Sequence, residues 1–257
     1  KTYEEVVAAA EKIRAAGKMK YPYAAAYKAG WNLAEEFVNM YIGHGGEFFE
    51  AGSAKPSINN AKGVATLNML KKLADLSNPD YLTHDSEAIK VEWEAGNVAI
   101  MTLWASRSGT LLDDEGDAKI TAATKLVAPA TVGGGNIPAA TLWWDGFTLA
   151  KNRPDADAEA SFRAMAHAAS SKEMVAKAAD QAVWLVEGFV PGPKSVGVIE
   201  AVKMGAKPYP MLPQMGLMHG ALGNEIVEFL QGNETAEQAL KDVEAAYNTK
   251  AKEQGFL

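Results

Sequence analysis

Apolar residues recur at helical spacing along much of the chain, and short apolar runs separate these helical stretches. The clearest example is residues 86–104, SEAIKVEWEAGNVAIMTLW. Asp85 or Ser86 can cap a helix here, and Gly96 suits the left-handed residue that follows its end. The run at 98–101 is then short and apolar, which is typical of a buried strand. The segment therefore predicts a capped helix, a glycine stop, a strand and a tryptophan just past the strand.

The same reasoning predicts alternating helices and strands in the remaining chain. Expected helices lie at 1–17 with Thr2 and Glu5 as a capping box, 31–42, 60–76, 155–169, after Ser170, and after Thr235 with Gln238 as a second capping box. Expected strands lie at 20–27, 118–127 and 141–150, and a Gly/Pro-rich turn or crossing lies at 186–194. Such alternation indicates the α/β class.

Composition narrows the range of functions. The 257 residues are 48% hydrophobic and 22% charged, which is ordinary for a soluble globular protein. The net charge of -7, with scattered Lys and Arg, argues against nucleic acid and anionic membrane surfaces as partners. No apolar run approaches the roughly 18 residues of a membrane span. The absence of cysteine excludes disulfides, thiolate metal sites and a cysteine nucleophile.

Motifs for catalysis, cofactors or metals do not occur. The four histidines, His44, His84, His167 and His219, are not at metal-ligand spacing. The acidic run 113–117 lacks the alternating oxygens of a calcium loop and indicates a solvated turn between strands. Gly133–Gly135 fits neither a dinucleotide fingerprint nor a P-loop, and no serine lies in a nucleophile-elbow pattern. We therefore expect no cofactor, no metal and no catalytic residue.

In order and spacing, these elements resemble the solute-binding proteins of sugar ABC importers, the maltose-binding-protein-like group. The resemblance covers the whole chain. It rests on the TYEE helix at Thr2–Glu5, the helix ending at Gly45-Gly46, EAIKVEWEAGNVAIMTLW at 87–104, the strand at Trp144–Phe147 leading into KNRPDADAEASFRAMAHAASSKE, the turn near Pro191, LPQM at Leu212–Met215, and GNETAEQAL before the closing helix.

The resemblance implies a two-lobed α/β fold, type II-like, with crossing strands between the lobes and ligand in the cleft. Residues 1–140 plus 192–257 would form the C-terminal lobe, and 141–191 would belong to the N-terminal lobe. The remainder of that lobe is expected upstream of Lys1, because the chain opens directly on a helix cap. The 141–191 segment should then expose apolar surface.

Aromatic residues at strand ends are the candidate ligand-binding residues, because the C–H faces of a pyranose ring pack on aromatic planes. Trp104 has the best position, next to a strand end; its alternative role is to fill core. In Trp143-Trp144, strand alternation sends the rings to opposite faces, so at most one is core. Asp145, beside Gly146, can accept two hydroxyls or form a hinge salt bridge.

Four further candidates follow from the resemblance. Tyr27 and Trp31 flank the Ala29-Gly30 break after a strand, although Trp31 could instead begin the core face of its helix. Arg107 can bind hydroxyls or cap a helix. His219 follows LPQM, where relatives often present an aromatic ring, and imidazole can both stack and hydrogen-bond.

The expected function is a non-enzymatic, monomeric receptor that binds a mono- or oligosaccharide and delivers it to membrane permease subunits. It would be periplasmic, or lipid-anchored and extracellular. Two alternatives stay open. One is a receptor for another solute, such as a polyamine or a phosphorylated polyol. The other is a glycan-processing enzyme, which needs a pair of carboxylates about 5 to 9 Å apart.

Overall fold

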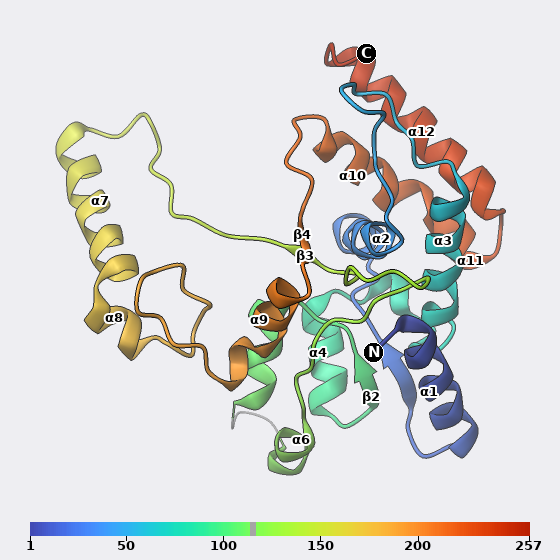
Figure 1. Ribbon diagram of the computed structural model, residues 1–257, viewed down its shortest axis with the longest axis horizontal. Coiled ribbons are helices and arrows are strands. Elements are labelled where there is room, and N and C mark those ends of the chain that lie inside the picture. The colour runs from blue at the N-terminus through green and yellow to red at the C-terminus, as the bar shows by residue number, and fades with distance from the viewer. Residues whose placement is uncertain (114–116) are drawn as a thin grey trace.

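The computed structural model describes residues 1–113 and 117–257 (Figure 1). Its α-helices are α1 (Tyr3–Ala16), α2 (Trp31–Gly43), α3 (Ala61–Ala74), α4 (Ser86–Glu94), α5 (Ala105–Ser108), α6 (Ala118–Ala123), α7 (Asp155–Ser170), α8 (Lys172–Lys177), α9 (Val196–Lys203), α10 (Met215–Glu225), α11 (Val227–Gln231) and α12 (Ala236–Glu253). Its 3-10 helices are η1 (Tyr81–Thr83), η2 (Gly109–Leu112) and η3 (Pro193–Ser195). Its strands are β1 (Tyr21–Ala24), β2 (Val98–Met101), β3 (Thr141–Leu142) and β4 (Lys207–Pro208).

The strands form two parallel pairs. In the first, β1 lies beside β2, with Tyr21 opposite Val98. In the second, β3 lies beside β4, with Thr141 opposite Lys207. Parallel strands end at the same edge, so the residues that follow each pair emerge close together.

The main core lies among α2, α3, α10 and α12, which Figure 1 shows gathered on one side of the molecule. The predicted apolar stripe of α3 faces this core, because Leu67, Leu70 and Leu73 are fully buried. A smaller cluster around Ile89 and Val98 joins α4 to β2.

Local capping signals in the first half of the chain are confirmed. Glu5 N donates to Thr2 Oγ1 at 3.2 Å, and Thr2 N donates to Glu5 Oε2 at 3.0 Å, which completes the capping box of α1. Ala88 N donates to the Asp85 carboxylate at 3.1 Å, so Asp85 rather than Ser86 caps α4. Gly96 has φ +71°, as the predicted stop requires.

The predicted strand at 118–127 is wrong, because α6 occupies 118–123. Asp117 explains the difference: its carboxylate accepts a hydrogen bond from Lys119 N at 2.7 Å and so begins a helix. The acidic run is therefore flanked in the sequence by η2 and α6 rather than by strands. At its start, Asp113 forms an ion pair with Lys194, whereas Asp114, Glu115 and Gly116 lie outside the described residues.

The predicted strand at 141–150 is mostly wrong, because β3 ends at Leu142 and residues 143–150 are exposed. A strand needs a partner, and β4 offers only two residues to pair with.

Two predicted helix caps also differ from those in the structure. Ser171, not Ser170, caps α8. At α12, Thr235 accepts from Gln238 N at 3.2 Å, but the Gln238 side chain donates to Asp242, so only half of that capping box forms.

Residues 141–191 carry α7 and α8, which follow each other, are in contact, and lie apart from the main core in Figure 1. Large apolar side chains are exposed along this segment, as expected for it: Trp143, Trp144, Phe147, Leu149, Phe162, Leu185 and Val190. Its assignment to a separate lobe stays a prediction.

Among the described residues, no helix combines the length and the hydropathy needed to cross a bilayer.

Candidate functional site

An aromatic residue follows each of the four strands. Trp31 comes after β1, Trp104 after β2, Trp143 directly after β3, and Tyr209 directly after β4. Because each strand pair is parallel, its two aromatic residues emerge at one edge. This topology brings together side chains that are far apart in the sequence.

The rings of these four residues, together with that of His219 on α10, form what we call the aromatic cluster. Trp31 lies at its centre, with its ring centroid 5.4 Å from that of Trp104, 5.9 Å from Trp143 and 4.9 Å from His219. The Trp143 and Tyr209 centroids are 4.3 Å apart. Trp31 is 49% exposed and Trp143 51%, so the cluster presents aromatic surface to solvent. Rings at these distances also stabilise one another.

His219 is the buried member of the aromatic cluster. It is 4% exposed, and its Nε2 lies 3.0 Å from the Trp31 carbonyl oxygen while its Nδ1 lies 2.9 Å from the Tyr209 hydroxyl. A carbonyl oxygen only accepts, so Nε2 carries the proton and Nδ1 accepts from Tyr209. Burial lowers the pKa of His219, which keeps it neutral. Both ring nitrogens are engaged, so His219 positions Trp31 and Tyr209 rather than offering a free polar group.

Arg107 lies at the edge of the cluster. Its guanidinium carbon is 5.6 Å from the centre of the Trp104 ring, and the guanidinium forms an ion pair with Glu87 of α4. The cation covers part of the indole and holds it by a cation–π interaction. Arg107 therefore orients Trp104, and among the described residues its other donors have no hydrogen-bond partner.

The carboxyl group of Glu35 is buried next to the aromatic cluster. Glu35 is one helical turn after Trp31 on α2 and is 2% exposed. Its Oε1 is 2.7 Å from Thr141 Oγ1 and 3.2 Å from Trp143 Nε1, whereas its Oε2 is buried and has no hydrogen-bond partner among the described residues. Burial raises the pKa of Glu35 to about 7, against the opposing effect of the bonds from Thr141 and Trp143.

Five of the nine predicted site residues thus meet at one place: Trp31, Trp104, Trp143, Arg107 and His219. Tyr27 does not. It is fully buried in the main core, with its ring edge-on to Tyr81, because β1 ends before it and the chain turns inward. The expectation that it faces a ligand is not met.

The other three predicted residues, Trp144, Asp145 and Gly146, lie beside the cluster but outside it. All three are exposed, and Trp144 makes no ring contact within the described chain. Asp145 forms no ion pair with any described residue, so the hinge salt bridge is not observed. Of the adjacent pair, Trp143 joins the cluster and neither tryptophan is core.

Sequence reasoning missed Tyr209 and Glu35. Tyr209 follows a two-residue strand, which is too short to give a period-2 pattern. Glu35 stands next to Glu36 in a helix, where paired charges normally indicate a solvated face. Only the spacing of four residues from Trp31 hinted that Glu35 shares its face.

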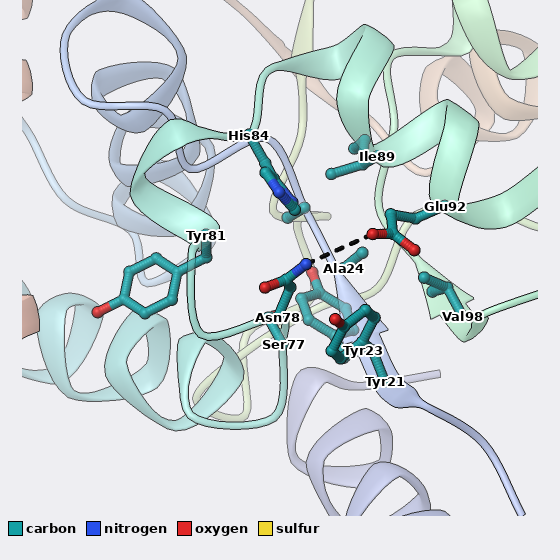
Figure 2. A pocket seen from close by; sticks show the side chains of 11 residues that line it. Tyr21, Tyr23, Ala24, Ser77, Asn78, Tyr81, His84, Ile89, Glu92 and Val98 are labelled. Carbon is teal, nitrogen blue, oxygen red and sulfur yellow. Dashed lines mark hydrogen bonds between the residues drawn. The ribbon is translucent and has the colours of Figure 1, made fainter.

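Two cavities lie away from the cluster. The first has a volume of about 10 Å³, room for one water molecule, and Figure 2 shows Asn78 and Glu92 facing each other within it. The second, of about 530 Å³, is an open hollow between 148–153 and α7. The first is too small for a sugar, and the second is lined by no aromatic ring. Within 1–113 and 117–257, no group of three or more His, Asp or Glu could hold a metal ion.

Comparison with known proteins shows the fold. No protein-family model matches the chain, and no curated protein matches it in sequence. Solved structures do match. An ABC transporter solute-binding protein from Agrobacterium radiobacter K84, in complex with ribitol, has a TM-score of 0.77 and 18% identity over 96% of this chain and 64% of its own. The maltose-bound MalE3 of T. maritima has a TM-score of 0.78 and 17% identity over 96% of this chain and 65% of its own.

A third structure, the maltose/maltodextrin-binding domain MalE from Bdellovibrio bacteriovorus bound to maltotriose, has a TM-score of 0.76 and 14% identity over 98% of this chain and 67% of its own. The chain therefore spans about two thirds of the length of these structures. It has the α/β fold of periplasmic solute-binding proteins, as the sequence motifs predict.

Proposed function

Starting from that fold, we propose that this chain is part of the substrate-binding receptor of a carbohydrate ABC importer. It binds a mono- or oligosaccharide on the aromatic cluster and delivers it, unchanged, to membrane permease subunits. The observation that carries the proposal is the convergence of four rings at the ends of two parallel strand pairs, of which Trp31 and Trp143 are half exposed and Trp104 and Tyr209 are partly buried. Aromatic planes suit the C–H faces of sugar rings.

The chemistry of the cluster supports the role of a receptor. Aromatic planes supply binding surface, Arg107 supplies donors at the rim, and the exposed Asp145 nearby supplies acceptors for hydroxyls. Where a second lobe closes over the ligand, closure is favoured by the ligand's higher affinity for the closed state. Such a receptor works in the periplasm, or outside the cell on a lipid anchor, as a monomer.

Two alternatives differ in ligand or in chemistry. A receptor for a linear polyol is favoured by the ribitol and mannitol in two of the matching structures. A polyamine receptor would need several exposed acidic groups around the cluster, where Asp145 is exposed but Glu35 is buried and Glu87 is paired with Arg107. A glycan-processing enzyme would need a second carboxylate working opposite Glu35 or Asp145 across the ligand.

We expect binding without turnover. The chain is screened by thermal shift against maltose, maltotriose, mannitol, ribitol, chitin oligosaccharide and spermidine, and each compound that raises Tm is recovered and examined by mass spectrometry. The expected result is a shift with at least one sugar or polyol, which is recovered unmodified. A shift with spermidine alone favours the polyamine receptor. Product in molar excess over protein that disappears in Glu35→Gln or Asp145→Asn establishes the enzyme instead.

The Trp104→Ala variant tests the site directly. Loss of one stacked aromatic plane should weaken sugar binding by about 1–3 kcal/mol. The loss of stability should stay below the roughly 3–5 kcal/mol of a deleted core aromatic, because Trp104 is only partly buried. Calorimetry measures both. Trp184→Ala is the matched control, since its indole bonds to the Ala178 carbonyl away from the cluster; equal loss of affinity in both variants contradicts the assignment.

A further inference from the structure

The rings of Trp31 and Trp104 are held in different ways. Hydrogen bonds from the three residues before Trp31 fix its backbone: Lys28 N donates to His84 O at 2.9 Å, Ala29 N to Leu82 O at 3.0 Å and Gly30 N to Gly223 O at 2.9 Å. Within residues 1–113 and 117–257, the indole N–H of Trp104 has no hydrogen-bond partner. Its ring is close to perpendicular to that of Trp31, at 85°, and the Arg107 guanidinium carbon lies 5.6 Å from its centre. The guanidinium therefore bears directly on the orientation of this indole.

The first turn of α4 holds this guanidinium. Glu87 lies in that turn and forms an ion pair with Arg107. Arg107 comes three residues after Trp104, on α5, so its side chain can lie over the indole while its guanidinium reaches Glu87. Among the described residues, no other carboxylate forms an ion pair with Arg107. Glu87 is therefore the described carboxylate that can keep Arg107 over the Trp104 ring.

The same turn of α4 is also tied to the segment before Trp31. Asp85, which caps α4, forms an ion pair with Lys28 at 3.1 Å. Ile89 of α4 is 1% exposed and packs in the smaller hydrophobic cluster, so this part of the helix is anchored by core packing. One turn of α4 thus connects with both tryptophans, with Trp31 through Lys28 and with Trp104 through the ion pair described above.

We propose that Glu87 is a positioning residue for the candidate site: by holding Arg107 over the Trp104 indole, it fixes that ring at its angle to Trp31. The effect on sugar recognition rests on the proposed function, whereas the coupling between Glu87 and Trp104 does not. The Arg107 side chain is 41% exposed and that of Glu87 64%, so salt screens the pair and its effect is modest. Loss of the pair should therefore weaken ligand binding by about two- to fivefold.

The first test needs no ligand. The six tryptophans are labelled as fluorotryptophan, and Trp104→Phe identifies the fluorine NMR resonance of Trp104. Glu87→Gln should shift and narrow this resonance, because an indole that is no longer held samples several orientations. Glu94→Gln is the matched control, since it removes the same charge from α4 and breaks an ion pair with Lys90. It should leave the Trp104 resonance in place.

Either of two results in this experiment overturns the proposal. One is a Trp104 resonance in Glu87→Gln that matches the wild type in position and width. The other is an equal shift in Glu94→Gln, which would show that any loss of charge from α4 has the same effect.

A double-mutant cycle tests whether Glu87 acts through Arg107. Arg107→Gln should by itself move the Trp104 resonance, and Glu87→Gln should add nothing in that background, because the carboxylate then has no cation to hold. In Arg107→Lys a cation remains, so Glu87→Gln should still move the resonance. A full additional shift in the Glu87→Gln, Arg107→Gln double variant would show another route to Trp104 and would overturn the proposal.

The second test measures affinity for maltotriose and mannitol by calorimetry at low salt and at about 1 M NaCl, where the Debye length is about 3 Å. Both compounds are uncharged, so a salt dependence that differs between two variants arises within the protein. Wild-type affinity should fall by about two- to fivefold, whereas Glu87→Gln should bind more weakly at low salt and change little. Parallel salt profiles in the two proteins contradict the link to recognition. If neither compound binds at either salt concentration, the proposed function fails for these two ligands, and the NMR result alone decides the role of Glu87.

Discussion

Replacing Gly223 with alanine is expected to destabilise the protein by about 3 kcal/mol, because it forces α10 away from the start of α2. A Cβ atom at Gly223 would lie 2.2 Å from the Gly30 carbonyl oxygen and 2.5 Å from the Gly30 carbonyl carbon. These are backbone atoms, so no rotamer change can relieve the clash. Gly30 N also donates to Gly223 O at 2.9 Å, which ties the two segments together. Urea unfolding at constant m-value measures the loss.

The same substitution should weaken sugar binding. Gly30 precedes Trp31, and Gly223 lies one helical turn after His219, so separating them breaks the His219–Trp31 hydrogen bond. Gly220→Ala on the same helix is the matched control, since nothing lies within 4 Å of a Cβ there. It should be neutral or stabilising by up to about 1 kcal/mol through helix propensity. Equal destabilisation in both variants would show that the close approach is unimportant.

Glu36→Met is expected to stabilise the protein by about 3 kcal/mol near pH 9 and to have little effect near pH 4. Glu36 is 5% exposed in the core, and no hydrogen bond within the described residues reaches its carboxyl group. Burial, and then the neighbouring Glu35, raise its pKa from 4.5 to about 8. Met has a similar volume and no charge to desolvate.

The direction of this pH dependence follows from the pKa of Glu36 in the unfolded chain and in the folded chain. Below about 4.5 both the folded and the unfolded chain bind the proton, so Glu36 is neutral in both. As pH rises from 4.5 to about 8, the unfolded chain releases this proton while the folded chain retains it, and the free energy of unfolding falls. The advantage of Glu36→Met should therefore grow over this window and stay constant above it.

Chemical denaturation at several pH values measures this difference. Glu11→Met on the exposed side of α1 is the control, and it should change stability by less than about 0.5 kcal/mol at every pH. A Glu36→Met curve that runs parallel to the wild-type curve from acid to alkaline pH contradicts the prediction.

Structural features that depend on residues close together in the sequence were predicted correctly. The capping box at Thr2 and Glu5, the Asp85 cap, the Gly96 stop and the strand at 98–101 all have the predicted form. Each depends on the backbone geometry of one short segment, so the residues present settle it without distant partners. The order of such segments also sufficed to identify the fold.

Pairing between distant segments was decided only by the tertiary structure. β3 is two residues long because β4 offers no more to pair with, and α6 stands where a strand was predicted because the Asp117 carboxylate caps a helix there. The candidate site follows the same rule. Trp104 was found from its own strand, but its contact with Trp31 depends on the pairing of β1 with β2, and the contact of Trp143 with Tyr209 depends on the pairing of β3 with β4.

The exposure of several residues could not be predicted from their sequence context. Tyr27 and Trp31 flank the same break, yet Tyr27 is fully buried and Trp31 is half exposed. Glu35 and Glu36 look like a solvated pair, yet α10 and β3 pack against α2 and enclose both. The sequence by itself determined which segments are helices and where a strand delivers a tryptophan. Which side chains face one another was decided by tertiary packing, because the parallel strands bring together residues that lie 77 positions apart in one pair (Tyr21 and Val98) and 66 in the other (Thr141 and Lys207).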